Sequence, residues 1–363
     1  MENIKECLDG FALPASDGMR KYLGITEPVG QVGLTCVLYF RGGHLPEVQA
    51  KACECIREYV QILGKEARCC LTPAGRIVMA GEKGLPLMDV KQVSKRQEKD
   101  SITASYLVSS NATREEFKRQ PPKCMLRIGL YLKKRNVLYS RKRARPDMPS
   151  DIPLDRQVSY IFASFAPSLF LVDEPPIPFA DLVLKWCQRL RPVNGTAGWG
   201  VTRACDILYA ESIRSFIAPD LLRFPGLEMP DTLFPDTFTE HIATINWLTM
   251  LNEELAARIG GPERLRSLGE DFPIAEYPGG YVIQAGPRPE LGDRNKGDIP
   301  RFYARVHELL RPLYPPLECM TYLTGAVLPP DAGPDFDPRV FGFAPEDQIY
   351  LHDFFRQWMH RFD

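Results

Sequence analysis

GLTCVLYFRGGHLPEVQAKACECIREYVQILG, residues 33–64, is the stretch that decides the fold. Its first eight residues are apolar or small on both alternating faces, which is typical of a β-strand covered on both sides. After RGGHLP, apolar residues recur at helical spacing, from Val48 through Ala52 and Cys55 to Leu63, and Gly64 ends the run. The stretch therefore predicts a buried strand followed by an amphipathic helix.

A second strand–helix unit follows the same plan. VSYIFASF (158–165) predicts a strand, FADLVLKWCQRLRP (179–192) a helix stopped by Pro192, and GTAGWGV (195–201) a further strand. Other segments predict strands at 101–110, 124–132 and 281–285, and helices at 239–259, 262–269, 299–313 and 346–363. The fold class is therefore α+β, with a mixed or mostly antiparallel sheet on which helices pack, and with two possibly related strand–helix units.

The domain organisation follows from these units. We expect residues 1–32 to be an N-terminal extension and residues 33–363 to form the main domain. The two units suggest two subdomains within it, at about 33–157 and 158–363.

Composition points to a globular cytoplasmic protein. The chain has 363 residues, a formal net charge of −1 and 33 prolines, which cluster in the connections. No secretory signal is visible at MENIKECLDG and no apolar run approaches the roughly 20 residues that span a bilayer. We therefore expect the ten cysteines to be free thiols in a reducing compartment. They are Cys7, Cys36, Cys53, Cys55, Cys69, Cys70, Cys124, Cys187, Cys205 and Cys319.

The loop GPRPELGDRNKGD (286–298), which follows the strand at 281–285, resembles a working site because it is rich in glycine and charge. It contains neither GxGxxG nor the P-loop pattern, and its charges nearly balance, whereas a phosphate site favours net positive potential. We expect it to be a structural connection in which Asp298 caps the helix that follows.

Catalytic and metal-binding signals are weak. His44 follows two glycines at a strand end and is the one histidine whose position suggests catalysis, so a hydrolase or transferase using His44 is an alternative function. HExxH and GxSxG are absent, and the cysteines lack zinc-site spacing. We predict no catalytic residue, metal or cofactor, and a protein that is not an enzyme.

Two kinds of charged segment suggest binding. The basic segment KKRNVLYSRKRARP (133–146) fits a solvated face, a protein interface or a nucleic-acid site, and nucleic-acid binding is the second alternative function. Acids and aromatics share the segments 227–241 and 329–338, a mixture that suits docking on a basic protein. The predicted interface residues are Glu228, Asp231, Phe234, Asp236, Phe238, Asp331, Asp335, Phe336 and Asp337.

Several motifs in this order resemble the type VI secretion immunity protein family, called TsiV. They are LYFRGGHLPE (38–47), WCQRLRPVNGTAGWG (186–200), RFPGLEMP (223–230), INWLTMLNEELAARIGG (245–261), YPGGYVIQAGPRPELGDRNKGD (277–298) and RFD (361–363). The resemblance runs from about residue 33 to the end of the sequence and is poorest over 65–157. The basic segment 133–146 departs most from the family.

The resemblance implies a cytosolic antidote without a reaction of its own. Its partner would be a cognate secreted toxin encoded nearby, of the PD-(D/E)xK nuclease type, whose active or DNA-binding surface it blocks. A membrane or nucleic-acid partner is not expected, and the oligomeric state stays open. Shared motif residues are expected to be scaffold: Arg41, Gly42, Gly43, His44, Asn246, Trp247, Gly286, Arg288, Gly292, Asp293 and Asp298.

Overall fold

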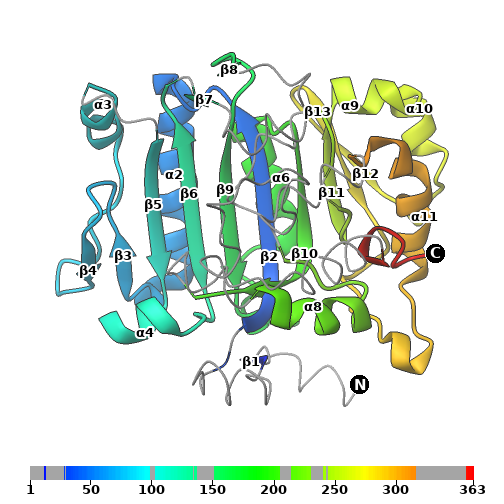
Figure 1. Ribbon diagram of the computed structural model, residues 1–363, viewed down its shortest axis with the longest axis horizontal. Coiled ribbons are helices and arrows are strands. Elements are labelled where there is room, and N and C mark those ends of the chain that lie inside the picture. Colours follow the sequence, from blue (N-terminus) through cyan, green and yellow to red (C-terminus); the bar gives the residue numbers. More distant parts are fainter. Residues whose placement is uncertain are drawn as a thin grey trace, which may run out of the picture.

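One large sheet organises the part of the chain that the computed structural model describes, which is residues 12–13, 28, 30–98, 103–133, 135–136, 151–204, 214–229, 240–242, 244–315 and 357–363 (Figure 1). The described strands are β1 (Ala12–Leu13), β2 (Gly30–Arg41), β3 (Cys69–Leu71), β4 (Ile77–Met79), β5 (Thr103–Ser109), β6 (Met125–Tyr131), β7 (Arg135–Asn136), β8 (Asp151–Ile152), β9 (Val158–Phe165), β10 (Asn194–Thr202), β11 (Leu248–Asn252), β12 (Ile274–Tyr277) and β13 (Gly280–Gln284). The sheet order is β12-β13-β11-β10-β2-β9-β6-β5-β3-β4, with β1 beside β2, while β7 and β8 pair separately.

Every pairing between these strands is antiparallel. The described α-helices are α2 (Pro46–Leu63), α3 (Val90–Glu98), α4 (Arg114–Arg119), α6 (Phe179–Leu190), α8 (Arg214–Arg223), α9 (Glu253–Arg258), α10 (Gly261–Arg266) and α11 (Arg301–Leu310). Short 3₁₀ turns are η2 (Gly64–Glu66), η3 (Pro167–Leu169), η5 (Arg294–Lys296) and η6 (Arg311–Leu313). The α+β class predicted from the sequence is confirmed.

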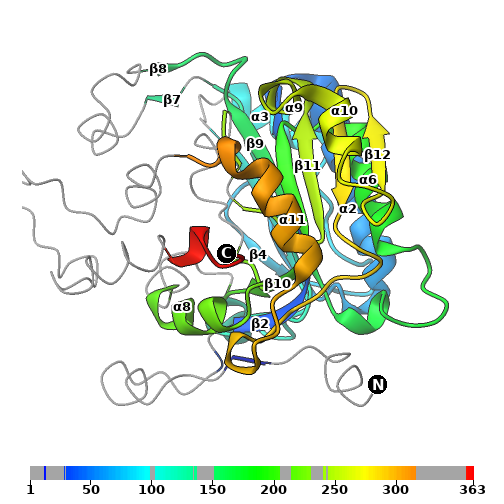
Figure 2. The ribbon, with the colours of Figure 1, turned by 90° about the vertical axis from the view of Figure 1, so that its right-hand side faces the viewer.

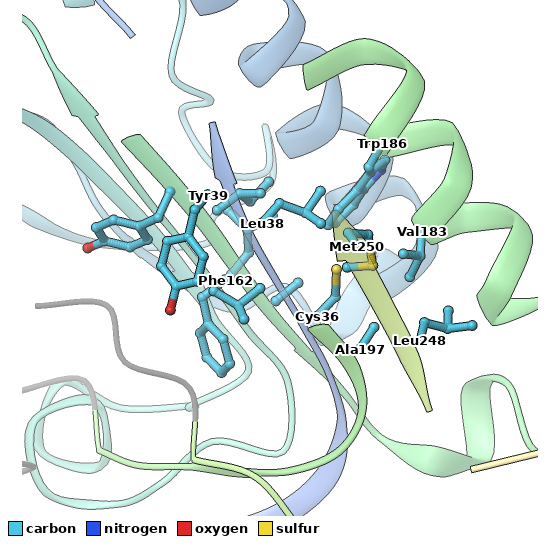
Figure 3. Packing of buried hydrophobic residues seen from close by; sticks show 14 of the residues in the cluster. Cys36, Leu38, Tyr39, Phe162, Val183, Trp186, Ala197, Leu248 and Met250 are labelled. Carbon is cyan, nitrogen blue, oxygen red and sulfur yellow. The ribbon is translucent and has the colours of Figure 1, made fainter. Parts of the chain in front are cut away.

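Strand β2 lies in the middle of the sheet and is covered on both faces. Val37 stands opposite Thr196 on β10 and Phe162 on β9, and all three are buried. Figure 3 shows Cys36 and Leu38 on the side of Trp186, whereas Tyr39 and Phe162 lie on the other side. Because neither face meets water, β2 has no apolar–polar alternation.

Helices cover both faces of this sheet, as Figure 2 shows in profile. Helices α2 and α6 lie on one face, and α8, α11 and the residues 357–363 lie on the other. The apolar stripe of α6 is buried from Phe179 to Leu190 and includes Trp186, at 1% exposure. Burial of each such large apolar side chain contributes roughly 1.5–3 kcal/mol. Because each helix buries such side chains on one face, its apolar residues repeat at helical spacing in the sequence.

A polar contact ties α2 to α6 at their outer edge. The carboxylate of Glu58 accepts hydrogen bonds from Lys185 and Arg189, and from Trp186 Nε1 at 3.1 Å. Burial by itself would raise the pKa of Glu58, but these hydrogen bonds lower it overall. The two helices are thus joined by an ion-pair group as well as by apolar contact.

The two strand–helix units are interleaved in the middle of the sheet, because the first strand of each unit pairs with a strand from the other segment of the chain. Strand β2 pairs with β10, which follows α6, whereas β9 pairs with β6, which precedes it in the chain. Strands β2 and β9 also pair with each other. The segments 33–157 and 158–363 therefore share one sheet, and a division between them stays a prediction.

One predicted helix is wrong in part. Within 239–259, residues Leu248–Asn252 form strand β11 between β10 and β13, and of the residues described in this range only Glu253–Arg258 is helical. A strand buried on both faces has a continuous apolar run, which helical spacing also fits. Asn252 caps α9, since its side chain accepts from Leu255 N at 2.9 Å. The predicted helix at 346–363 lies mostly outside the described residues.

Candidate functional site

The glycine-rich loop 286–298 uses its charges within the fold. Asp293 accepts from Arg223 of α8, with Nε at 3.1 Å and Nη2 at 2.9 Å, and from the main-chain N of Asn295 at 3.1 Å. The hydrogen bond from Arg223 lowers the pKa of Asp293. Arg294 Nη2 donates to the carbonyl of Arg361 at 3.0 Å. These contacts fit the predicted structural connection, whereas Arg288 points to solvent as an exposed side chain.

Backbone geometry explains why position 292 of this loop is a glycine. Gly292 has a φ of +68°, and a Cβ there would lie 2.7 Å from Pro300 Cδ. The predicted cap is wrong, however, because Pro300 precedes α11 and no side chain caps that helix. Asp298 instead pairs through its main chain with Asp293, whose own side chain caps η5.

Asn246 and Trp247 hold this loop against the sheet. Trp247 Nε1 donates to the carbonyl of Gly286 at 3.0 Å, and Asn246 Nδ2 donates to the carbonyl of Trp199 at 2.9 Å. Gly198 permits the second contact, since a Cβ there would lie 2.0 Å from Asn246 Oδ1. Both side chains are buried and act as internal supports.

Glu228, which the sequence predicted to contact the toxin, lies in the interior of the protein. It is 3% exposed, and its Oε2 accepts from Thr196 Oγ1 at 2.7 Å and from Asn246 Nδ2 at 3.2 Å. Burial raises the pKa of this carboxyl group. Its main chain also bridges to β10, with Val201 N donating to the Glu228 carbonyl at 2.7 Å. The prediction that it lies on an exposed acidic surface is wrong, because its side chain belongs to this interior network.

Arg361 of the terminal RFD motif is a second buried charged residue, and nothing in the residues themselves marked it as buried. It is 1% exposed and donates to the carbonyls of Pro225, Trp358 and Ile245 at 2.9, 3.0 and 3.2 Å, and to the hydroxyl of Thr244. Its guanidinium also lies 3.6 Å from the ring centre of Trp358. Burial lowers its pKa to about 10. A single side chain thus joins segments more than a hundred residues apart.

The RGGH segment is also integrated in the fold. Arg41 donates to both carboxylate oxygens of Glu254, at 3.2 and 3.0 Å. Gly42 has a φ of +80°, and a Cβ on Gly43 would lie 2.0 Å from Ser159 Oγ. His44 is half-buried, and within the described part of the chain its Nδ1 has no hydrogen-bond partner to orient it.

The cysteines that the structure describes are not activated nucleophiles. All seven are free and buried. Burial raises the pKa of Cys53, Cys69 and Cys124 to about 11 and that of Cys55 to about 12. Among the described residues, no group of three His, Cys, Asp or Glu side chains is placed to hold a metal ion. No helix in these same segments has the length and apolarity to cross a membrane.

The other predicted contact residues lie outside the described residues: Asp231, Phe234, Asp236, Phe238, Asp331, Asp335, Phe336 and Asp337. So does most of the basic segment 133–146. The structure therefore shows where the predicted scaffold residues lie, corrects Glu228, and leaves the other predicted contact residues as a prediction.

Comparison with known proteins identifies relatives of this arrangement. The family model TsiV, described as type VI immunity for VRR-NUC, matches residues 138–318. That segment contains β9, α6, β10, β11 and the loop 286–298, and the match confirms the family that the motifs resemble. The Pseudomonas aeruginosa T6SS protein PA0821 is 20% identical over 80% of this chain and 75% of that chain, with a TM-score of 0.61, which shows a shared fold. A search among curated proteins found no match.

Proposed function

Because residues 138–318 belong to the TsiV family, type VI immunity for VRR-NUC, we propose that this chain binds and neutralises a cognate VRR-NUC toxin. It acts in the cytoplasm by covering the active or DNA-binding surface of the toxin, which is encoded nearby. The family match is the observation that carries this proposal.

The interior polar network supports a binding role. Glu228, Asn246, Asp293 and Arg361 have their charges and hydrogen bonds directed at neighbouring segments of the same chain. These contacts fix the described segments that they join, so little conformational entropy is lost where a partner binds those segments. Glu228 and Arg361, whose pKa values are altered, are both buried and serve this scaffold.

An inhibitor that must outlast a toxin needs a slowly dissociating complex. We expect a Kd at or below about 1 nM, which corresponds to about −12 kcal/mol. The interface should bury at least about 1,600 Å² and contain a few aromatic anchors. The predicted contact residues Phe234, Phe238 and Phe336 are the proposed anchors.

Co-expression with the neighbouring toxin tests the proposal. We expect growth to be rescued and the two proteins to elute together in size-exclusion chromatography. A catalytically inactive toxin serves as the sample for measuring Kd. Rescue without a complex would contradict stoichiometric inhibition and would make His44 the first residue to mutate. Failure to rescue, with both proteins expressed and folded, would reject the immunity role against that toxin.

A further inference from the structure

A pocket lies at the end of the sheet where strands β2 and β11 and helix α6 finish. These ends of the three elements are at the top of Figure 1. Its volume is about 410 Å³. We call it the Arg191 pocket, and its lining includes Arg41, Arg191, Pro192, Asn252, Glu253 and Gly279. No residue predicted to contact the toxin lies in it.

The walls of the Arg191 pocket are held by main-chain hydrogen bonds. Asn252 N donates to the carbonyl of Val193 at 2.8 Å, and Glu253 N donates to that of Gly279 at 3.0 Å. Tyr277 OH donates to the carbonyl of Pro192 at 3.0 Å. The ion pair between Arg41 and Glu254 fixes a further side of the pocket. A ligand would therefore meet a preformed cavity, which favours binding.

The pocket lining contains two charged side chains of opposite sign, Arg191 and Glu253, that do not form an ion pair with each other. Arg191 and Glu253 are both exposed, and the side chain of neither forms a hydrogen bond or ion pair with another residue in the described part of the chain. By contrast, Arg41 in the same lining is already bound to Glu254. An unpaired guanidinium can bind a carboxylate through two parallel hydrogen bonds.

The backbone at Arg191 is a second, independent observation. Its φ of 49° and ψ of 62° are left-handed, and it is the only non-glycine residue with positive φ among those described. Glycine is the usual residue at such a helix end, because a Cβ makes the conformation unfavourable. Strained residues of this kind cluster at ligand clamps. An arginine at a position that suits glycine indicates a use for its side chain.

We propose that the Arg191 pocket is part of the toxin-binding surface, an inference that rests on the proposed function. It takes a toxin segment that places a carboxylate against Arg191 and a basic side chain against Glu253. Pro192 and Pro278 provide rigid apolar walls for the stem of that segment. None of its lining residues belongs to the acidic segments 227–241 and 329–338, and it adds a pair of opposite charges to the proposed interface.

Charge reversal at the pocket tests the inference. Binding of the purified, catalytically inactive toxin is measured for R191E and E253K, with R76E and E82K as controls. The controls reverse the same charges on exposed residues around the β3–β4 hairpin, at the far end of the sheet. We expect Kd to rise at least tenfold for each pocket variant and to change less than twofold for each control.

A third variant separates binding from folding. R191G should raise the urea midpoint of unfolding, because glycine adopts the left-handed conformation without strain, and should still weaken toxin binding at least fivefold. If R191E and E253K bind as tightly as the unaltered protein, the pocket is not part of the interface, while the immunity function stands. If the unaltered protein does not bind the toxin, the proposed function fails and this inference fails with it.

Discussion

Asp293 and Arg223, seventy residues apart in the chain, form a two-point ion pair with N–O distances of 3.1 and 2.9 Å. This pair joins the glycine-rich loop to α8 and occupies the loop's most enclosed carboxylate. A loop that resembles a phosphate site is thereby part of the scaffold.

Replacing Asp293 should destabilise the protein in a pH-dependent way. D293N is expected to lower the urea midpoint at neutral pH, because the pair with Arg223 is lost. Since the folded-state pKa of Asp293 is lowered from 3.8, its contribution is present above that value and disappears as pH falls through the folded-state pKa. The difference between the two proteins should shrink in that acid range. D298N, which alters an exposed side chain in the same loop, is the control.

Arg361 should be one of the most sensitive positions. R361M leaves the carbonyls of Pro225, Trp358 and Ile245 and the hydroxyl of Thr244 without their donor, so we expect a loss of about 3–5 kcal/mol in unfolding free energy. R361K should fall between, because an ammonium has fewer donors and no planar fork. R305A breaks an exposed pair with Glu308 and should change stability by less than about 0.5 kcal/mol. Equal effects at positions 305 and 361 would contradict the buried network.

Glu228 should behave as a buried acid. E228A is expected to cost about 1–3 kcal/mol, since Thr196 and Asn246 lose their acceptor. E228Q keeps an acceptor and should equal or exceed the unaltered protein in stability at neutral pH. Because burial raises the folded-state pKa above 4.5, the stability of the unaltered protein falls relative to E228Q as pH rises through that pKa. Below pH 4.5 the two curves should run together. Urea unfolding at a series of pH values measures this.

Thiol titration tests the buried cysteines. A variant with serine at positions 7, 205 and 319 retains the seven described cysteines, all buried. We expect no rapid reaction with an aromatic disulfide reagent under native conditions and complete reaction in denaturant, because thiols with raised pKa values form little thiolate. A fast-reacting thiol in that variant would show that one of these sites is open.

The acidic segments should act mainly on the rate of association. D231N/D236N is expected to lower kon for the toxin, and to make kon less dependent on salt, with little change in koff. E270Q/D271N removes two charges from exposed side chains outside the acidic segments and serves as the control. Unchanged kon in D231N/D236N, or kon that is equal at low and high salt, would remove these residues from the proposed interface.

The sequence by itself determined the local elements with strong periodicity. The strand at 33–40 and the helix after it were predictable because the helix repeats apolar residues on one face and ends at Gly64. The family motifs also indicated the immunity role, and the match over 138–318 agrees with them. In these cases the information lies in neighbouring residues or in motif order.

Tertiary structure alone decided the remaining features, because they depend on contacts between distant segments. Residues 248–252 form a strand because they pair with β10 on one side and with β13 on the other. Their apolar run also fits helical spacing, so the sequence pattern does not distinguish a strand from a helix there. Glu228 and Arg361 belong to charged residue types that are mostly exposed, yet both are enclosed by partners supplied from across the fold. Their burial follows from where the sheet brings those partners, which no local pattern records.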